Sequence, residues 1–309
     1  MCYLKKLILS KFEFKMTLLL MAAGSGSRYG KLKQFDDIGP NSEFLMEFSI
    51  FDALQNGFKH IVVVTKKENQ AFLKKYLSER LDNSIKLDIL VQDVNDIPDA
   101  SSFSGERKKP WGTAHAVWTA RAVIKTPFVI VNADDYYGQN SFKGAAEFIK
   151  TQKVTDVFGL IGYQLKDTLS DFGTVSRGIC TVKGKHLQNI VERTKIFKNN
   201  GIIKDEDSNE ILDANATVSM NFWICTPKIF EYTKRYFTKF LDQAENHEKN
   251  EIYLPFVAQE MMEKGSITVE IINTDSEWFG VTYYRDKDMA VETLKHLTEI
   301  GKYPSPLWQ

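Results

Sequence analysis

The segment from Leu18 to Phe35 reads LLLMAAGSGSRYGKLKQF, and it decides the class of fold that we expect. Its first part is an apolar run typical of a strand buried on both faces of a sheet. The run leads into six small residues, 22–27, which let the backbone approach a ligand closely and direct N–H groups at phosphate oxygens. Three cations, Arg28, Lys31 and Lys33, follow before the first acid, Asp36. The segment therefore predicts a phosphate-binding turn after a buried strand.

Two common phosphate-binding loops do not fit the spacing of this segment. The dinucleotide-binding pattern G-x-G-x-x-G needs a third glycine where Tyr29 stands. The Walker loop needs four residues between its glycines, whereas five separate Gly24 from Gly30, and Leu32 follows Lys31. A tight turn with solvated lysines is the alternative, and the added cations favour a phosphate site.

Apolar runs and helix-period segments alternate along the rest of the chain. We expect strands at residues 17–22, 60–65, 87–92 and 128–133, and helices at residues 44–54, 69–81 and 114–124. After about Lys150 closely spaced strands dominate, ahead of helices near residues 230–241, 252–262 and 286–300. The pattern predicts an α/β fold, in which a mostly parallel sheet lies between helical layers and a strand-rich second half is built onto it.

The charge balance limits the partners of the chain. Forty Lys and Arg residues balance forty Asp and Glu residues, so the global basic field of a nucleic-acid or membrane-surface binder is missing. No stretch approaches the roughly 20 apolar residues of a membrane span. The three cysteines, Cys2, Cys180 and Cys225, are far apart and form no CxxC pair, which favours a reducing compartment. We predict a cytoplasmic protein that binds neither nucleic acid nor membrane.

The segments AAGSGSRYG and LKQF resemble the N-terminal signature of the nucleotidylyltransferase superfamily. WGTAHAV (residues 111–117) and FVIVNADDYYG (residues 128–138) resemble further motifs of it, and the sugar-1-phosphate nucleotidylyltransferases (nucleotide-sugar pyrophosphorylases) are the most similar members. The resemblance implies a Rossmann-like fold of the nucleotide-diphospho-sugar transferase type. It also implies an enzyme that transfers NMP from an NTP to a sugar 1-phosphate and releases pyrophosphate, with Mg²⁺ as cofactor.

The resemblance assigns roles to residues near the ends of the predicted strands. Arg28 and Lys33 match cations that neutralise the nucleotide phosphates, and Asp134 matches the aspartate that binds Mg²⁺; we predict these three as the catalytic residues. Asp134 follows a buried strand, where open α/β sheets bind ligands, and Mg²⁺ prefers one or two carboxylates together with substrate phosphates. A turn-forming acid pair with Asp135 is the alternative. The predicted nucleotide-binding residues are Ala22, Ala23, Gly24, Ser25, Gly26, Gln92, Gly112 and Thr113. For His115, inside the helix that starts here, packing is favoured over a functional role.

Three segments of the second half, DFGTVSRG, NIVERT and SMNFWIC, resemble strands of the family's sugar pocket. By this resemblance Gly173, Glu192 and Asn221 are the predicted substrate-binding residues. Each of them alone also fits an ordinary edge-strand residue. Their order along the chain is what supports the resemblance.

The segment WFGVTYYRDKD, residues 278–288, resembles the one that carries the family's second metal ligand. It departs from the family at that point, because Phe279 and Thr282 stand where relatives have aspartate or asparagine. We predict Asp286 as the second metal ligand, with Asp275 as the other candidate nearby. A surface or helix-capping role is the alternative for each.

The organisation that we expect follows from these segments. Residues 1–15 are an N-terminal extension, disordered or a mis-called start, and residues 16–309 form a single nucleotidyltransferase domain. Within it residues 16–150 bind the nucleoside triphosphate and residues 151–309 bind the sugar 1-phosphate, while a homo-oligomer is left open. Three alternatives are kept: a cytidylyltransferase acting on a polyol or alcohol phosphate, a glycosyltransferase of related fold, and a non-catalytic nucleotide or sugar-phosphate sensor.

Overall fold

A computed structural model describes residues 16–24, 35–99, 101, 103, 105, 107–243, 245, 247–281 and 285–308 of the chain. Its centre is a parallel sheet of four strands, β1 (Met16–Ala22), β2 (Phe58–Thr65), β3 (Lys86–Val91) and β4 (Phe128–Asn132). These strands lie in the order β3, β2, β1, β4, with Leu19 of β1 beside Val62 and Ile130. The predicted strands of the first half are confirmed to within two residues at each end.

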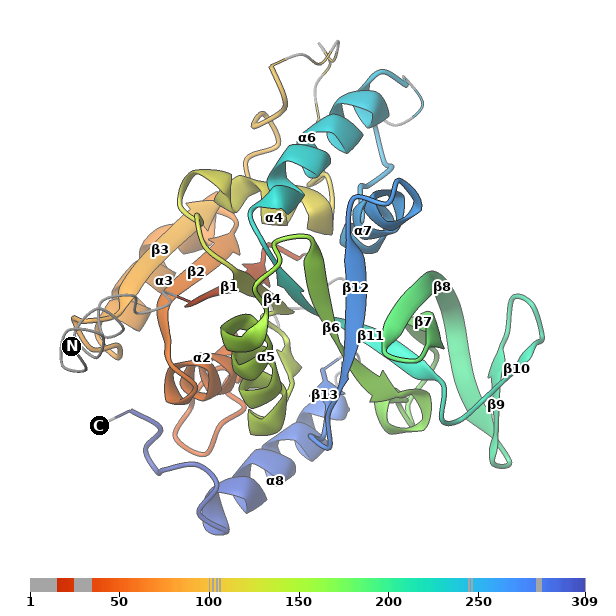
Figure 1. The fold of residues 1–309 in the computed structure, drawn as a ribbon. Coiled ribbons are helices and arrows are strands. Elements are labelled where there is room, and N and C mark those ends of the chain that lie inside the picture. Colours follow the sequence, from red (N-terminus) through yellow and green to blue (C-terminus); the bar gives the residue numbers. More distant parts are fainter. Residues whose placement is uncertain are drawn as a thin grey trace, which may run out of the picture.

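The side chains of the central strands alternate between the two faces of this sheet. Leu18 and Leu20 pack on one face and Leu19 and Met21 on the other, because successive residues of a strand point in opposite directions. Both faces are covered by helices, which explains why the strands are apolar throughout. One face carries α2 (Leu45–Gln55), α3 (Lys67–Ser78) and α5 (Gln139–Thr151), and the other carries α4 (Thr113–Thr119), α6 (Lys228–Leu241) and α7 (Leu254–Glu263). Figure 1 shows α4, α6 and α7 above the sheet and α2 and α5 below it.

The second half extends the same sheet. β11 (Thr217–Cys225) runs antiparallel between β4 and β6 (Val157–Gln164), and β12 (Thr268–Asn273) is parallel to β6. β7 (Val175–Lys183) and β8 (His186–Asn199) form a long antiparallel hairpin, which continues through β9 (Ile202–Asp205) to β10 (Ile211–Leu212). Among the described residues this sheet has 11 strands. The predicted α/β fold with a strand-rich second half is confirmed. The parallel pairing is found among β1–β4 and between β6 and β12, whereas the other strands of the second half pair antiparallel.

The C-terminal part of the chain packs against α2. A two-stranded sheet of β5 (Asp135–Tyr136) and β13 (Phe279–Gly280) leads to α8 (Asp286–Glu299), which Figure 1 shows below α5. The segment after α8 returns to α2, where Tyr303 donates its hydroxyl hydrogen to Asp52 Oδ2 at 2.8 Å. Within the described ranges, no helix is both long and apolar enough to cross a membrane.

Candidate active site

The carboxyl ends of the parallel strands meet at one edge of the sheet. Ala23 and Gly24 follow β1, Gln92 follows β3, and Asp134 follows β4. Three cavities lie at or beside this edge, and we name each after one residue of its lining: the Gln92 cavity, the Asp134 cavity and the Asp286 cavity. This is the part of an open α/β sheet where ligands bind.

The Gln92 cavity has a volume of about 250 Å³ and gathers most of the predicted nucleotide-binding residues. Its lining is Met21, Ala23, Gly24, Lys66, Gln92, Lys109, Pro110, Gly112, Thr113, Ala116 and Glu251. Ala22 is instead buried within β1. The predicted residues Ser25, Gly26, Arg28 and Lys33 lie outside the described residues.

A buried hydrogen-bond network fixes the orientation of the Gln92 amide. Gln92 Nε2 donates to the carbonyl oxygen of Gly112 at 3.0 Å and to His115 Nδ1 at 3.1 Å. His115 Nε2 donates to the carbonyl oxygen of Asp96 at 2.9 Å, so Nδ1 is the accepting nitrogen of the ring. Burial lowers the pKa of His115 to about 4, which keeps the ring neutral. Both amide hydrogens of Gln92 are thus used inside the protein, and its oxygen is the side-chain atom that these two bonds leave for another partner.

His115 was expected to be a packing residue, and it is fully buried. It nevertheless holds Gln92, which lines the cavity. The apolar periodicity of one helix does not reveal this contact between helix and strand end. The neighbouring Gly112 has a φ of 101°, and a Cβ there would lie 2.5 Å from the carbonyl oxygen of Ile252. Thr113 Oγ1 accepts a hydrogen bond of 2.9 Å from the amide of Leu254, the first residue of α7. The WGT segment therefore joins the cavity to α7.

The Asp134 cavity has a volume of about 190 Å³ and brings together Asp134, Glu192 and Asn221. They come from the loop after β4, from β8 and from β11. The other lining residues are Asn132, Asp135, Ser176, Arg177, Gly178, Ile190, Ser219, Met220, Pro255 and Trp278. Asn221 has a φ of 61° at an irregularity of β11 between Ser219 and Trp223, a conformation that asparagine adopts more easily than most residues.

Asp135 is more deeply buried than Asp134 and is held in place by its neighbours. Its Oδ2 accepts hydrogen bonds from Asn132 Nδ2 at 2.8 Å and from the Tyr137 hydroxyl at 3.1 Å. The backbone of Gly280 packs directly on it, since a Cβ at Gly280 would lie 2.6 Å from Asp135 Oδ1. The site therefore presents two adjacent carboxylates, of which Asp135 is fixed by hydrogen bonds.

Arg177 is the buried cation of this site, and our sequence analysis assigned no role to it. Its side chain is 7% exposed and lines both the Asp134 and the Asp286 cavity. Burial lowers the pKa of Arg177 to about 10, and the negative charges of Asp135, Glu192 and Asp286 oppose this shift. Desolvation by the surrounding residues raises the pKa of Glu192, and Arg177 opposes that shift too. The signal in the sequence is the inward register that Arg177 shares with Val175 on β7.

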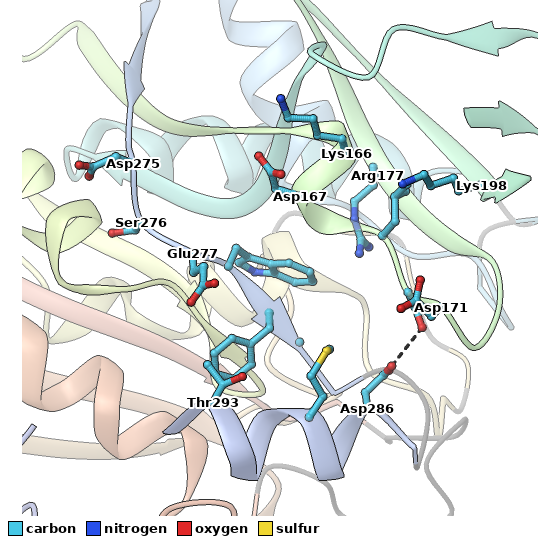
Figure 2. Close-up of a pocket in the computed structure, with 16 residues that line it drawn as sticks. Lys166, Asp167, Asp171, Arg177, Lys198, Asp275, Ser276, Glu277, Asp286 and Thr293 are labelled. Carbon is cyan, nitrogen blue, oxygen red and sulfur yellow. Dashed lines mark hydrogen bonds between the residues drawn. The ribbon is translucent and has the colours of Figure 1, made fainter. Parts of the chain in front are cut away.

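The Asp286 cavity has a volume of about 450 Å³ and lies on the other side of Arg177 and Trp278, which line both cavities. Figure 2 shows Asp275 and Asp286, the two candidates for the second metal ligand, on opposite sides of it. Asp134 lines the other cavity, and Gly173 lies in a turn bridged to Ser170 rather than in the lining of either. Phe279 packs in the core, stacked on Tyr136 at a ring distance of 4.6 Å. Thr282 is outside the described residues.

Comparisons with known proteins identify the family and the fold of the chain. The model of the family described as nucleotidyl transferase matches residues 18–285, whereas no curated protein matches the sequence. A UDP-glucose pyrophosphorylase complexed with UDP-glucose is 18% identical, with a TM-score of 0.57 over 91% of this chain and 98% of that one. A putative glucose-1-phosphate thymidylyltransferase from Bacillus anthracis is 13% identical, with a TM-score of 0.63 over 91% of this chain and 95% of that one.

A third solved structure is that of the inositol-1-phosphate CTP transferase from T. maritima. It is 13% identical, with a TM-score of 0.61 over 92% of this chain and 97% of that one. At these identities the three structures show a common fold. The family model, in contrast, matches most of the chain by sequence, from β1 to Arg285, the residue before α8. The protein therefore belongs to the nucleotidyl transferase family of enzymes.

Proposed function

We propose that the protein transfers NMP from a nucleoside triphosphate to a sugar 1-phosphate and releases pyrophosphate, giving a nucleotide sugar. The observation that carries this proposal is the arrangement of the site: the Gln92 cavity and the Asp134 cavity lie at one sheet edge, at the ends of β3 and β4. The first offers an amide oxygen to a base. The second offers carboxylate and amide groups that suit hydroxyl groups. Two of the similar structures support the same substrate class. One is a putative glucose-1-phosphate thymidylyltransferase, and the other is a UDP-glucose pyrophosphorylase complexed with UDP-glucose.

The reaction needs positioning rather than a base. A phosphate monoester has a second pKa of about 6, so the acceptor phosphate is mostly dianionic at neutral pH and attacks the α-phosphorus directly. The protein must bring two anions together and stabilise charge at the α-phosphate and the leaving group. We assign this role to Arg28 and Lys33, as predicted from the sequence. In the Asp134 cavity, Glu192 and Asn221 bind the sugar, and Arg177 balances the charges of the carboxylates around it.

The residues present fit a magnesium ion that takes most of its ligands from phosphate. Among the described residues no cluster of three metal-ligating side chains exists, but Asp134 and Asp135 line the same cavity side by side. One or two carboxylates are what Mg²⁺ requires when a triphosphate supplies the other oxygens. Asp134 would hold the ion, which would offset phosphate charge during transfer. Asp286, predicted from the sequence as a second ligand, lines the neighbouring cavity, and the variants described below distinguish metal binding from a positioning role.

We also assign each substrate to one half of the chain and propose a location for the protein. Residues 16–150 provide all but one of the lining residues of the Gln92 cavity, Glu251 being the exception. We assign nucleotide binding to this half and sugar-phosphate binding mainly to residues 151–309. A cytoplasmic location is supported by Cys180 and Cys225, which are both free thiols.

Pyrophosphate release across the common nucleoside triphosphates and a panel of sugar 1-phosphates tests the proposal. Turnover with a sugar 1-phosphate is the expected result. The second candidate is a cytidylyltransferase for an alcohol phosphate, which the inositol-1-phosphate CTP transferase structure favours. Turnover only with CTP and a polyol phosphate would establish this candidate instead. A protein that binds nucleotide without turning over any pair would be a sensor.

A further inference from the structure

Asp286, the first residue of α8, holds a turn at residues 170–173 beside the Asp286 cavity. Asp286 is 3% exposed, and its Oδ1 accepts a hydrogen bond of 3.0 Å from Ser170 Oγ, the dashed line that ends on Asp286 in Figure 2. Ser170 Oγ in turn accepts from the amide of Phe172 at 3.1 Å, and Ser170 is bridged to Gly173. The carboxylate of Asp286 therefore fixes the turn 170–173.

Arg177 holds Thr168, which lies just before the turn 170–173. Its Nε donates to the carbonyl oxygen of Thr168 at 3.0 Å and to the Thr168 hydroxyl at 3.1 Å. Its guanidinium carbon, Cζ, lies over the ring of Trp278, 4.8 Å from the ring centre. Because Arg177 and Trp278 also line the Asp134 cavity, a shift of this loop would move the wall against which the acceptor binds.

The second residue of α8 contacts a different part of the chain. Lys287 Nζ forms an ion pair of 2.8 Å with Asp36 Oδ1, and the two side chains are 22% and 13% exposed. Asp36 directly follows the cationic segment that contains Lys33. Partly buried pairs of this kind are screened less by salt than surface pairs. Two consecutive residues thus tie the turn 170–173 and Asp36, which stands three residues after Lys33 in the sequence, to one helix.

We propose that Ser170, Asp286 and Lys287 are positioning residues that set the two substrates at the right distance for phosphoryl attack. The inference rests on the proposed function for its kinetic part. A displacement of about 1 Å between two reacting groups can cost about a hundredfold in rate, so a shared anchor on α8 has a direct effect on turnover. Asp286 then acts through Ser170, which differs from its predicted role as a metal ligand.

Variants of the Ser170–Asp286 pair separate the two roles. Ser170→Ala and Asp286→Ala should each lower kcat/KM about tenfold, as expected for a hydrogen bond to a charged group, by lowering kcat as well as raising KM for the acceptor. The double variant should be no worse than either single one, because one interaction is lost in all three. Asp286→Asn keeps an accepting oxygen and should recover most of the activity, with an unchanged Mg²⁺ requirement. If Asp286→Asn is inactive or needs more Mg²⁺ while Ser170→Ala is normal, Asp286 is a metal ligand and the proposal is wrong.

The other anchor is tested by Lys287→Met, which should raise KM for the nucleoside triphosphate more than KM for the acceptor. Lys295→Met is the matched control, since Lys295 lies on the same helix in an exposed pair with Glu299 at 3.9 Å, and it should behave as wild type. Equal effects of Lys287→Met on both KM values, or no effect, would contradict the assignment of this ion pair.

Hydrogen exchange without substrates tests the anchor independently of the reaction. Ser170→Ala and Asp286→Ala should accelerate amide exchange in residues 165–178 while leaving α5 as in wild type. Unchanged exchange in this loop overturns the inference even if the enzyme is active. An enzyme without turnover on any substrate pair defeats the proposed function, whereas faster exchange in both variants would still support the anchor.

Discussion

Replacing Gln92 by glutamate tests the network that orients this side chain. The wild-type Nε2 donates to Gly112 O at 3.0 Å and to His115 Nδ1 at 3.1 Å, so a glutamate would place an oxygen against two acceptors. His115 cannot relieve the conflict by turning its proton inward without losing its hydrogen bond to Asp96 O. In the wild type the ring is neutral, because burial lowers the pKa of His115 to about 4.

Each unsatisfied buried group costs about 1–3 kcal/mol, so we expect Gln92→Glu to lose about 2–6 kcal/mol in total. The loss is divided between the free energy of unfolding, measured by urea denaturation, and the binding of nucleoside triphosphate, measured by calorimetry. Lowering the pH should restore part of both, because a protonated glutamic acid regains one donor.

Gln70→Glu is the control for this variant. Gln70 Nε2 donates to the carbonyl oxygen of Ile89 at 2.8 Å and does not line the cavity. This control should lose stability without a specific loss of nucleotide affinity. Wild-type stability together with wild-type affinity in Gln92→Glu would refute the network.

Three further predictions concern the Asp134 cavity and a buried acid on α2. Asp134→Asn should abolish Mg²⁺-dependent pyrophosphate release while its circular dichroism stays normal; normal turnover would place the metal elsewhere. Glu192→Ala should raise KM for the sugar phosphate far more than KM for the nucleotide in initial-rate assays. Equal effects on both KM values would contradict its proposed role in binding the sugar phosphate. Burial raises the pKa of Asp52 from 3.8 to about 8, so the folded state retains a proton that the unfolded state releases above pH 4. The Tm should therefore fall as pH rises from about 4 to 8, and Asp52→Asn should flatten this slope in calorimetry, whereas an unchanged slope would assign it to other groups.

The fold could be predicted well because its signals are local. The runs LLLMA and HIVVVT are strands buried on both faces, and the helix near residues 44–54 appears as α2 (Leu45–Gln55) with Gly57 at a φ of 90° behind it. The helix expected at 114–124 stops at Thr119 and continues as a single 3₁₀ turn. An apolar period of 3.6 residues cannot distinguish the last α-helical turn from a 3₁₀ turn.

The lining of the Asp134 cavity was predicted only in part, because it depends on contacts between distant strands. Glu192 and Asn221 were found through their motifs, but Gly173 lines neither neighbouring cavity. The left-handed φ of Asn221 follows from a register shift in β11. A period of two residues predicts regular pairing and cannot locate such a shift. An asparagine at this position thus has a backbone reason to be there in addition to any contact with a sugar.

Arg177 shows most clearly why tertiary structure was needed. Strand periodicity places its side chain on the inward face beside Val175, where an unpaired guanidinium would be very costly. The cost is offset by hydrogen bonds to Thr168 and by the charges of Asp135, Glu192 and Asp286. Because these partners come from four separate parts of the chain, no local pattern contains them. A buried arginine on an inward strand position is therefore a reason to look for carboxylates around it. Here Glu192 lies on the neighbouring strand β8, while Asp135 and Asp286 come from β5 and α8.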